Sequence, residues 1–212
     1  MERDRIKIEG AVLGMLGTNC YFIENADTDE VVIVDPADDA GAIRDWCMDN
    51  RKKPAAILLT HGHYDHILAA EELRKAFSVK IYAAEAEKAL LEDASMNLSA
   101  AWSRPVTLKA DEFLRDGDVL SLAGTEIEVI ATPGHTAGGV CYHIREAGAL
   151  LSGDTLFAGS YGRTDFPTSS MSDLAHSVRE RLLTLPEGTL VYPGHGEGTS
   201  IGYEKQYNPL SR

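Results

Sequence analysis

Four short apolar runs in this chain each end in a glycine-containing turn that carries histidine or aspartate. The run from Ala56 to Thr60 leads directly into His-Gly-His-Tyr-Asp-His, which supplies His61, His63, Asp65 and His66. The other three runs lead into Thr-Pro-Gly-His-Thr, Ser-Gly-Asp-Thr and Pro-Gly-His-Gly, which contain His135, Asp154 and His195. One such turn residue alone indicates little. Four repeats of strand, glycine turn and metal-type side chain indicate one shared site at the ends of strands.

The residue types and their spacing favour a pair of metal ions. Alternate side chains of an extended turn point the same way, so His61 and His63 can converge on one ion while Asp65 and His66 serve a second. Together the turns offer five imidazoles and two carboxylates, enough for two divalent ions that share one carboxylate and leave a position for water. The alternative, a solvated polar turn without function, fits poorly with a strand before the segment and a helix after it.

The rest of the chain alternates β-type runs with helical patterns, which predicts an α/β fold with mixed sheets. Several runs are apolar on both faces, as in sheets that helices cover. Strands are expected at residues 21–23, 31–34, 56–60, 79–83, 127–131, 140–144, 149–151 and 190–192.

Three helices are readable from apolar residues at helical spacing. The first follows Asp35, which we expect to be its N-cap, with a supporting role at the site as the alternative. The second begins near His66, and the third begins at about Met171, after a capping-box candidate at Ser170. Residues 85–118 are less regular and form either the wall of a cleft or a helix and loop packed on the core.

Composition and charge exclude several classes of protein. A length of 212 residues predicts a single domain over residues 1–212. The 20 basic and 33 acidic residues give a net charge of −13, which repels polyanions and anionic membranes, so neither nucleic acid nor a membrane is an expected partner. The charged first ten residues lack an apolar signal-peptide core, and no apolar run approaches the roughly 20 residues of a membrane span, which predicts a cytoplasmic protein. The oligomeric state is not readable.

The three cysteines, Cys20, Cys47 and Cys141, are widely spaced and form no Cys-x-x-Cys pair. Neither a disulfide framework nor a structural zinc knuckle is therefore expected. We expect these thiols to be reduced and mostly buried.

The motif His-x-His-x-Asp-His resembles the metallo-β-lactamase superfamily, and the resemblance extends over nearly the whole chain. It implies an αβ/βα sandwich, in which two mixed sheets lie face to face between helices, with a binuclear site along one edge. By this resemblance His61, His63 and His135 hold the first metal, Asp65, His66 and His195 hold the second, and Asp154 bridges them. Zinc is the expected metal, with iron or manganese as alternatives.

The segments around residues 153–167 and 193–210 resemble the hydroxyacylglutathione hydrolases (glyoxalase II) and their persulfide dioxygenase relatives. His63 stands where the diiron flavoprotein branch carries Glu, the N-terminus does not suggest an exported β-lactamase, and the nuclease branches carry an extra domain or basic arm. In glyoxalase II a basic residue of the matching loop contacts the thiol carrier, which implies substrate binding by Arg163. The alternative is an ion pair between Arg163 and Asp165 that holds the loop in place. The sequence to Arg212 leads us to expect no C-terminal helical extension of the kind that completes the glutathione site in glyoxalase II, so the thiol carrier is left open.

The leading hypothesis is a metal-dependent thioester hydrolase acting on a small acyl-thiol such as S-lactoylglutathione. Two ions would lower the pKa of a shared water and so supply a hydroxide, positioned by Asp65 and Asp154. One ion would also stabilise the oxyanion that forms at the carbonyl. The alternative is a glutathione persulfide dioxygenase with a single iron on His61, His135 and Asp154. A non-catalytic binding module is disfavoured, since no ligand of the motif is missing. His143 and His176 lie outside the motif, and we expect ordinary structural roles for them.

Overall fold

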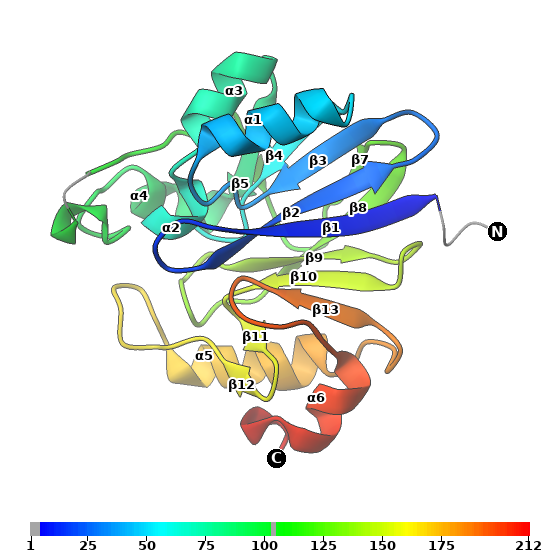
Figure 1. Ribbon diagram of the computed structural model, residues 1–212. Helices are drawn as coiled ribbons and strands as arrows, with labels where there is room; N and C mark the ends of the chain where they lie inside the picture. The colour runs from blue at the N-terminus through cyan, green and yellow to red at the C-terminus, as the bar shows by residue number, and fades with distance from the viewer. Residues whose placement is uncertain (1–4, 103–104) are drawn as a thin grey trace.

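Two six-stranded sheets lie face to face between two layers of helices (Figure 1). The computed structural model describes residues 5–102 and 105–212. The first sheet has the order β1-β2-β3-β4-β5-β6, with strands Ile6–Leu13, Thr18–Asn25, Glu30–Val34, Lys53–Leu58, Lys80–Ala84 and Glu112–Leu114. The second has the order β14-β13-β10-β9-β8-β7, with strands Thr199–Ser200, Leu190–Pro193, Ala149–Gly153, Val140–Ile144, Thr125–Ala131 and Val119–Leu122.

Both sheets mix parallel and antiparallel pairs, which confirms the predicted α/β sandwich. In the first sheet, β1, β2 and β3 pair antiparallel, whereas β3 to β6 pair parallel. In the second sheet only β10 and β13 pair parallel. A small hairpin of β11 (Leu156–Phe157) and β12 (Ser160–Tyr161) follows the second sheet's central strand β10.

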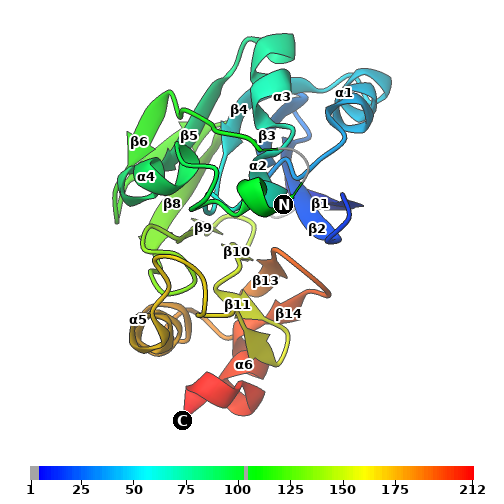
Figure 2. The same ribbon diagram turned by 90° about the vertical axis from the view of Figure 1, so that its left-hand side faces the viewer.

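The helices cover the outer faces of the two sheets (Figures 1 and 2). Helices α1 (Ala40–Asp49) and α3 (Ala70–Phe77) pack on the first sheet. Helix α5 (Met171–His176), which continues as a π-helical segment over Ser177–Leu182, packs with α6 (Ile201–Tyr207) on the second. The remaining short elements are α2 (Tyr64–Ile67), α4 (Lys88–Leu91) and the 3₁₀ turns Glu85–Glu87, Ser99–Ala101 and Pro209–Ser211. Among the described residues no helix combines the length and apolar character needed to cross a bilayer.

The two-residue period of the strands creates three apolar layers. In β3, Val31 and Ile33 pack against the outer helices, while Val32 and Val34 face the second sheet. The second sheet alternates in the same way, because Tyr142 faces the first sheet and Cys141 faces α5. The central strands of each sheet are thus buried on both faces, as their doubly apolar sequences predicted.

Several boundaries differ from the sequence-based expectations. Helix α1 begins at Ala40, and its N-cap is Asp39, whose side chain accepts from Ala42 N at 3.0 Å; the prediction of Asp35 as N-cap is wrong. The second predicted helix is two helices, because the chain turns between α2 and α3, and it begins at Tyr64 rather than His66. Strand β4 ends at Leu58, since Thr60 N donates to the Asp35 carboxylate instead of to a neighbouring strand. The predicted cap of α5 is confirmed, because the Ser170 hydroxyl accepts from Asp173 N at 3.3 Å.

Candidate metal centre

All seven predicted ligands lie together at the edge of the sandwich that faces the viewer in Figure 2, where α2 is labelled. His61 and His63 follow β4, and α2 carries Asp65 and His66. The second sheet supplies the remaining three from the loop between β8 and β9 and from the residues just after β10 and β13; these are His135, Asp154 and His195. The cluster therefore joins loops of both sheets, and it exists only when the sheets are packed together.

Two compact groups of potential ligand atoms occur in the cluster. One nitrogen from each of His61, His63 and His135 lies within 4.8 Å of the others, and His63 Nδ1 is 2.9 Å from His135 Nε2. The second group is Asp65, His66 and His195, within the same 4.8 Å limit. In it, Asp65 Oδ2 lies 3.3 Å from His195 Nε2 and 3.5 Å from His66 Nε2. These groups coincide with the two ligand sets that the family resemblance implied.

Asp154 lies between the two groups. Its Oδ2 is 3.5 Å from His135 Nε2 in the first group and 3.5 Å from His195 Nε2 in the second. Its Oδ1 is 3.5 Å from His66 Nε2. One carboxylate thus reaches both groups, which is the placement that a shared ligand requires.

Unpaired polar atoms at the centre fit a cation. His61 Nε2, His66 Nε2 and Asp154 Oδ1 are buried and make no hydrogen bond within the described part of the chain. Buried polar atoms nearly always have a partner, so these three require one that is not a protein group. Imidazole and carboxylate ligands suit zinc, iron and manganese. The donor set therefore fits two divalent ions.

Asp35 supports the site from behind His66. Its Oδ2 lies 2.9 Å from His66 Nδ1 and accepts from the Thr60 hydroxyl at 2.5 Å. A carboxylate at Nδ1 places the ring hydrogen there and leaves the Nε2 lone pair directed at the cluster. Asp35 and His61 also form a third compact group with His66, but the bonds to Thr60 and His66 already occupy the Asp35 carboxylate. Its role is thus the supporting alternative that the sequence left open.

The two groups differ in charge. Burial lowers the pKa of His61, His63 and His135, and that of His63 falls to about 3. Burial also acts to lower the pKa of His66, but the surrounding carboxylates, Asp65 first, outweigh it and raise this pKa to about 10. The first group therefore presents neutral imidazoles, whereas a cation at the second has to displace a proton from His66.

Arg163 lies beside the centre and forms the ion pair with Asp165 that was the alternative to substrate binding. Its guanidinium makes two 2.6 Å bonds to Asp165 and lies 4.1 Å from the centre of the Phe166 ring. The Arg163 carbonyl is 2.8 Å from His135 Nδ1, so the same loop orients a predicted ligand. Both charged side chains are about 60% exposed, which leaves Arg163 accessible to a substrate.

An apolar cleft adjoins the second group. It has a volume of about 240 Å³, and its lining includes Thr18 and the predicted ligand Asp65. Its walls include Met15 and Leu16 from the tip of the β1–β2 hairpin, and Trp102. Trp102 belongs to the segment predicted as a cleft wall, but the sequence did not single out the hairpin. The sequence feature that could have indicated the hairpin wall is the apolar pair Met15-Leu16 between two glycines, and both side chains are exposed in the structure.

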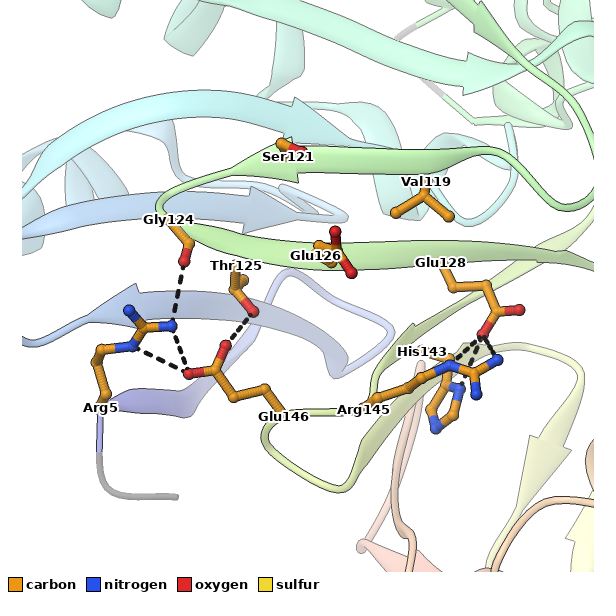
Figure 3. Close-up of a pocket in the computed structure, with 10 residues that line it drawn as sticks. All are labelled: Arg5, Val119, Ser121, Gly124, Thr125, Glu126, Glu128, His143, Arg145 and Glu146. Atoms are coloured by element: carbon orange, nitrogen blue, oxygen red, sulfur yellow. Dashed lines mark hydrogen bonds and ion pairs between the residues drawn. The ribbon is translucent and has the colours of Figure 1, made fainter. Parts of the chain in front are cut away.

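A larger cavity of about 510 Å³ lies elsewhere, where β7, β8 and the β9–β10 turn meet the start of β1 (Figure 3). Two ion pairs line it: Arg5 Nη2 with Glu146 at 2.6 Å, and Arg145 Nη2 with Glu128 at 2.8 Å. His143 Nδ1 lies 3.2 Å from Glu128. No predicted ligand lines this cavity, and His143 lies outside the metal cluster, as does His176 in α5.

Two mixed sheets between helices, with a cluster of histidines and aspartates at one edge, are the architecture of a metallo-hydrolase. The chain belongs to the metallo-beta-lactamase superfamily, whose family model matches residues 13–195. The probable metallo-hydrolase YqgX of Bacillus subtilis is 39% identical over 93% of this chain and 94% of its own length. The hydroxyacylglutathione hydrolase GloC of Haemophilus influenzae is 34% identical over 91% and 92%, respectively. The resemblance to this branch is confirmed.

Solved structures agree with these relatives. BLEG-1, described as a B3 metallo-beta-lactamase, has a TM-score of 0.92 and 39% identity over 96% of this chain and 99% of its own. A di-iron-bound form of TTHA1623 has a TM-score of 0.84 and 34% identity over 95% and 99%. ETHE1 from Myxococcus xanthus has a TM-score of 0.78 and 28% identity over 96% and 83%. The fold is thus shared with proteins of more than one description, so the fold alone does not determine the reaction.

Proposed function

We propose that this protein is a thioester hydrolase that works with two divalent metal ions, zinc in the first instance. The observation that carries the proposal is Asp154, whose carboxylate lies 3.5 Å from histidines of both ligand groups. In this proposal His61, His63 and His135 hold one ion, and Asp65, His66 and His195 hold the other. The relationship to GloC, named a hydroxyacylglutathione hydrolase, supports an acyl-thiol as the substrate.

The ions, when bound, would supply an activated water and a Lewis acid for the carbonyl oxygen. The chain's own groups then have positioning roles. Asp65 and Asp154 would position the reacting water, and Asp35 fixes the His66 ring through Nδ1. A thiolate leaves without help from an acid, so the carboxylates of Asp65 and Asp154, which lie 3.5 Å from His66 Nε2, are not required as proton donors.

We assign Arg163 to substrate binding. The guanidinium is held over Phe166, whose ring lies edge-on to His63 at 5.4 Å, so it stands next to the first group. A carboxylate of the substrate can replace Asp165 as its partner, since both residues are exposed. The apolar cleft on the opposite, Asp65 side offers room for an uncharged arm of the substrate.

Two other activities are favoured by specific neighbours. The 0.92 TM-score to a described B3 metallo-beta-lactamase makes β-lactam hydrolysis a second candidate for the same binuclear centre. The similarity to ETHE1 keeps the persulfide dioxygenase hypothesis, which uses one iron on His61, His135 and Asp154. Both make predictions that differ from those of the thioesterase.

The deciding experiment measures metal content in protein purified without added metal, and then tests three reactions on the same sample. We expect nearly two ions per chain and thiol release from S-lactoylglutathione, both strongly reduced in the Asp154→Ala variant. Hydrolysis of a β-lactam without thiol release would replace the proposal with the second candidate. One iron per chain with oxygen uptake on adding glutathione persulfide would replace it with the dioxygenase.

A further inference from the structure

A buried glutamate outside the ligand set joins the two loops of the first metal group. Glu87 ends the 3₁₀ turn after β5, and only 1% of its surface is exposed. Its Oε2 accepts a hydrogen bond from Gly62 N at 2.8 Å, and its Oε1 accepts one from Gly138 N at 2.8 Å. Each oxygen of the carboxylate thus holds a different loop.

These two loops supply all three histidines of the first group. Gly62 lies between His61 and His63, directly after β4 of the first sheet. Gly138 lies three residues after His135, in the loop that joins β8 to β9 of the second sheet. The Glu87 carboxylate therefore ties together loops of opposite sheets, and neither bond reaches the second metal group.

The packing allows the two amides to reach this carboxylate because both are glycine amides. A Cβ added to Gly62 would lie 2.8 Å from Leu90 Cδ2, and one added to Gly138 would lie 2.5 Å from Glu87 N. Residues 85–91 therefore occupy the space that side chains at Gly62 and Gly138 would need. Such close approach fixes the backbone on both sides of Glu87.

The cost of burying this group indicates that both bonds matter. Burial raises the pKa of the Glu87 carboxyl, so the site disfavours a free carboxylate. A glutamine of the same shape has one acceptor oxygen and one amide that only donates. Either orientation of that amide would place a donor against one of the two backbone N–H groups. Glutamate is thus suited to holding both loops at once.

We infer that Glu87 is a positioning residue that sets the spacing of His61 and His63 relative to His135, and through it the affinity of the first ion. The inference rests on the proposed binding of ions by these histidines. Outer groups that orient metal ligands typically change affinity by about 10–100-fold when removed. We expect a loss of that size for one of the two ions.

The test compares Glu87→Gln and Glu87→Ala with the wild type and with Glu24→Gln. Glu24 is a matched control because it is also a buried carboxylate, but it lies at the far end of β2 and pairs with Lys52. Each metal-free protein is titrated with Zn²⁺ against a chelator, and with Co²⁺ while its visible absorption is recorded. Thermal unfolding of the metal-free forms measures stability separately.

We expect both Glu87 variants to bind one ion about 10–100-fold more weakly, to retain the second, and to change the Co²⁺ spectrum. Glu24→Gln should lower stability and leave both affinities unchanged. Wild-type affinities and spectrum in Glu87→Gln would overturn the inference, as would an equal loss of both ions. Should Glu87→Ala not fold, Glu87→Gln decides alone. If the wild type binds two ions but hydrolyses no thioester, the proposed reaction is wrong, whereas the role of Glu87, measured by ion affinity, stands.

Discussion

The hydroxyl of Thr18 donates a 2.7 Å hydrogen bond to Oδ2 of Asp65. Thr18 also forms an isolated antiparallel bridge with His195, so the first residue of β2 contacts two members of the second group. The neighbouring Asn19 extends this junction, since its Nδ2 donates to the carbonyls of Pro193 at 2.8 Å and Gly196 at 3.0 Å. The β1–β2 hairpin is therefore part of the support of the site, beyond forming one wall of the cleft.

We predict that Thr18→Val weakens binding of the second ion by about tenfold and leaves the first unchanged. Valine keeps the shape of threonine but removes the hydroxyl, so Asp65 loses the bond that orients its Oδ2. Zn²⁺ titration against a chelator measures both affinities. Unchanged affinity of both ions would show that the hydrogen bond does not orient the ligand.

Gly194 is expected to tolerate no side chain. A Cβ there would lie 2.2 Å from Asp154 Oδ1 and 2.8 Å from His66 Cε1. Gly194→Ala should therefore displace both ligands, and we expect the loss of at least one ion per chain and most of the activity. Gly188→Ala is the control, because a Cβ at Gly188 meets nothing within 4 Å. Metal analysis of the two purified variants checks the prediction, which fails if they retain equal amounts.

Arg163 should affect binding of an anionic substrate rather than the chemistry. We predict that Arg163→Met raises KM for S-lactoylglutathione about tenfold, the loss of roughly one charged hydrogen bond, with kcat and ion content unchanged. Asp165→Asn, which frees the guanidinium, should not raise KM. A fall in kcat without a change in KM would instead assign the loop to the support of His135, which bonds to the Arg163 carbonyl.

The pair of Lys52 and Glu24 should contribute stability that disappears in strong alkali. The hydrogen bond to Glu24 raises the pKa of Lys52 from its ordinary value of 10.5. The contribution is therefore fully present below pH 10.5 and is lost as the pH rises through the higher folded-state pKa. We expect Lys52→Met to lower the free energy of unfolding by roughly 1 kcal/mol at pH 8. Urea unfolding of both proteins at pH 8 and above pH 11 tests the sign, since the difference should shrink only in alkali.

The three cysteines should be inert in the folded protein. All are buried and free, and burial raises the pKa of Cys47 to about 11 and that of Cys141 to about 12. Burial also raises the pKa of the Cys20 thiol. At pH 8 we expect a thiol reagent to react only slowly with the native protein. After denaturation it should react with all three thiols. Rapid reaction of one thiol in the native state would contradict this expectation.

The sequence predicted the central strands and the placement of the site because those features are local. A strand buried on both faces, such as β3 or β9, is a continuous apolar run, and the ligands follow such runs directly. The edge strands were not predicted, because their sequences are not continuous apolar runs. In β1 alternate residues are exposed and the run contains charged residues and glycine, while β6 has three residues and β7 four.

Roles that depend on contacts between distant segments were not readable. Asp35 has the sequence context of a helix cap, but its carboxylate bonds Thr60 and His66, 25 and 31 residues away. Glu87 stands in a polar stretch typical of an exposed helix, yet its partners lie 25 and 51 residues away. No periodicity or spacing marks either residue, because Asp35 acts on segments that follow the neighbouring strand β4, and Glu87 acts on loops of both sheets.

The division of the ligands between two sheets also determines when the site can be assembled during protein synthesis. A nascent chain that has emerged through β6 carries His61, His63, Asp65 and His66 but completes neither ligand group. The first group needs His135, and the second needs His195, which follows nearly the last strand. If the two groups hold ions as proposed, both ions can bind only late, once translation is almost finished and the second sheet has folded onto the first.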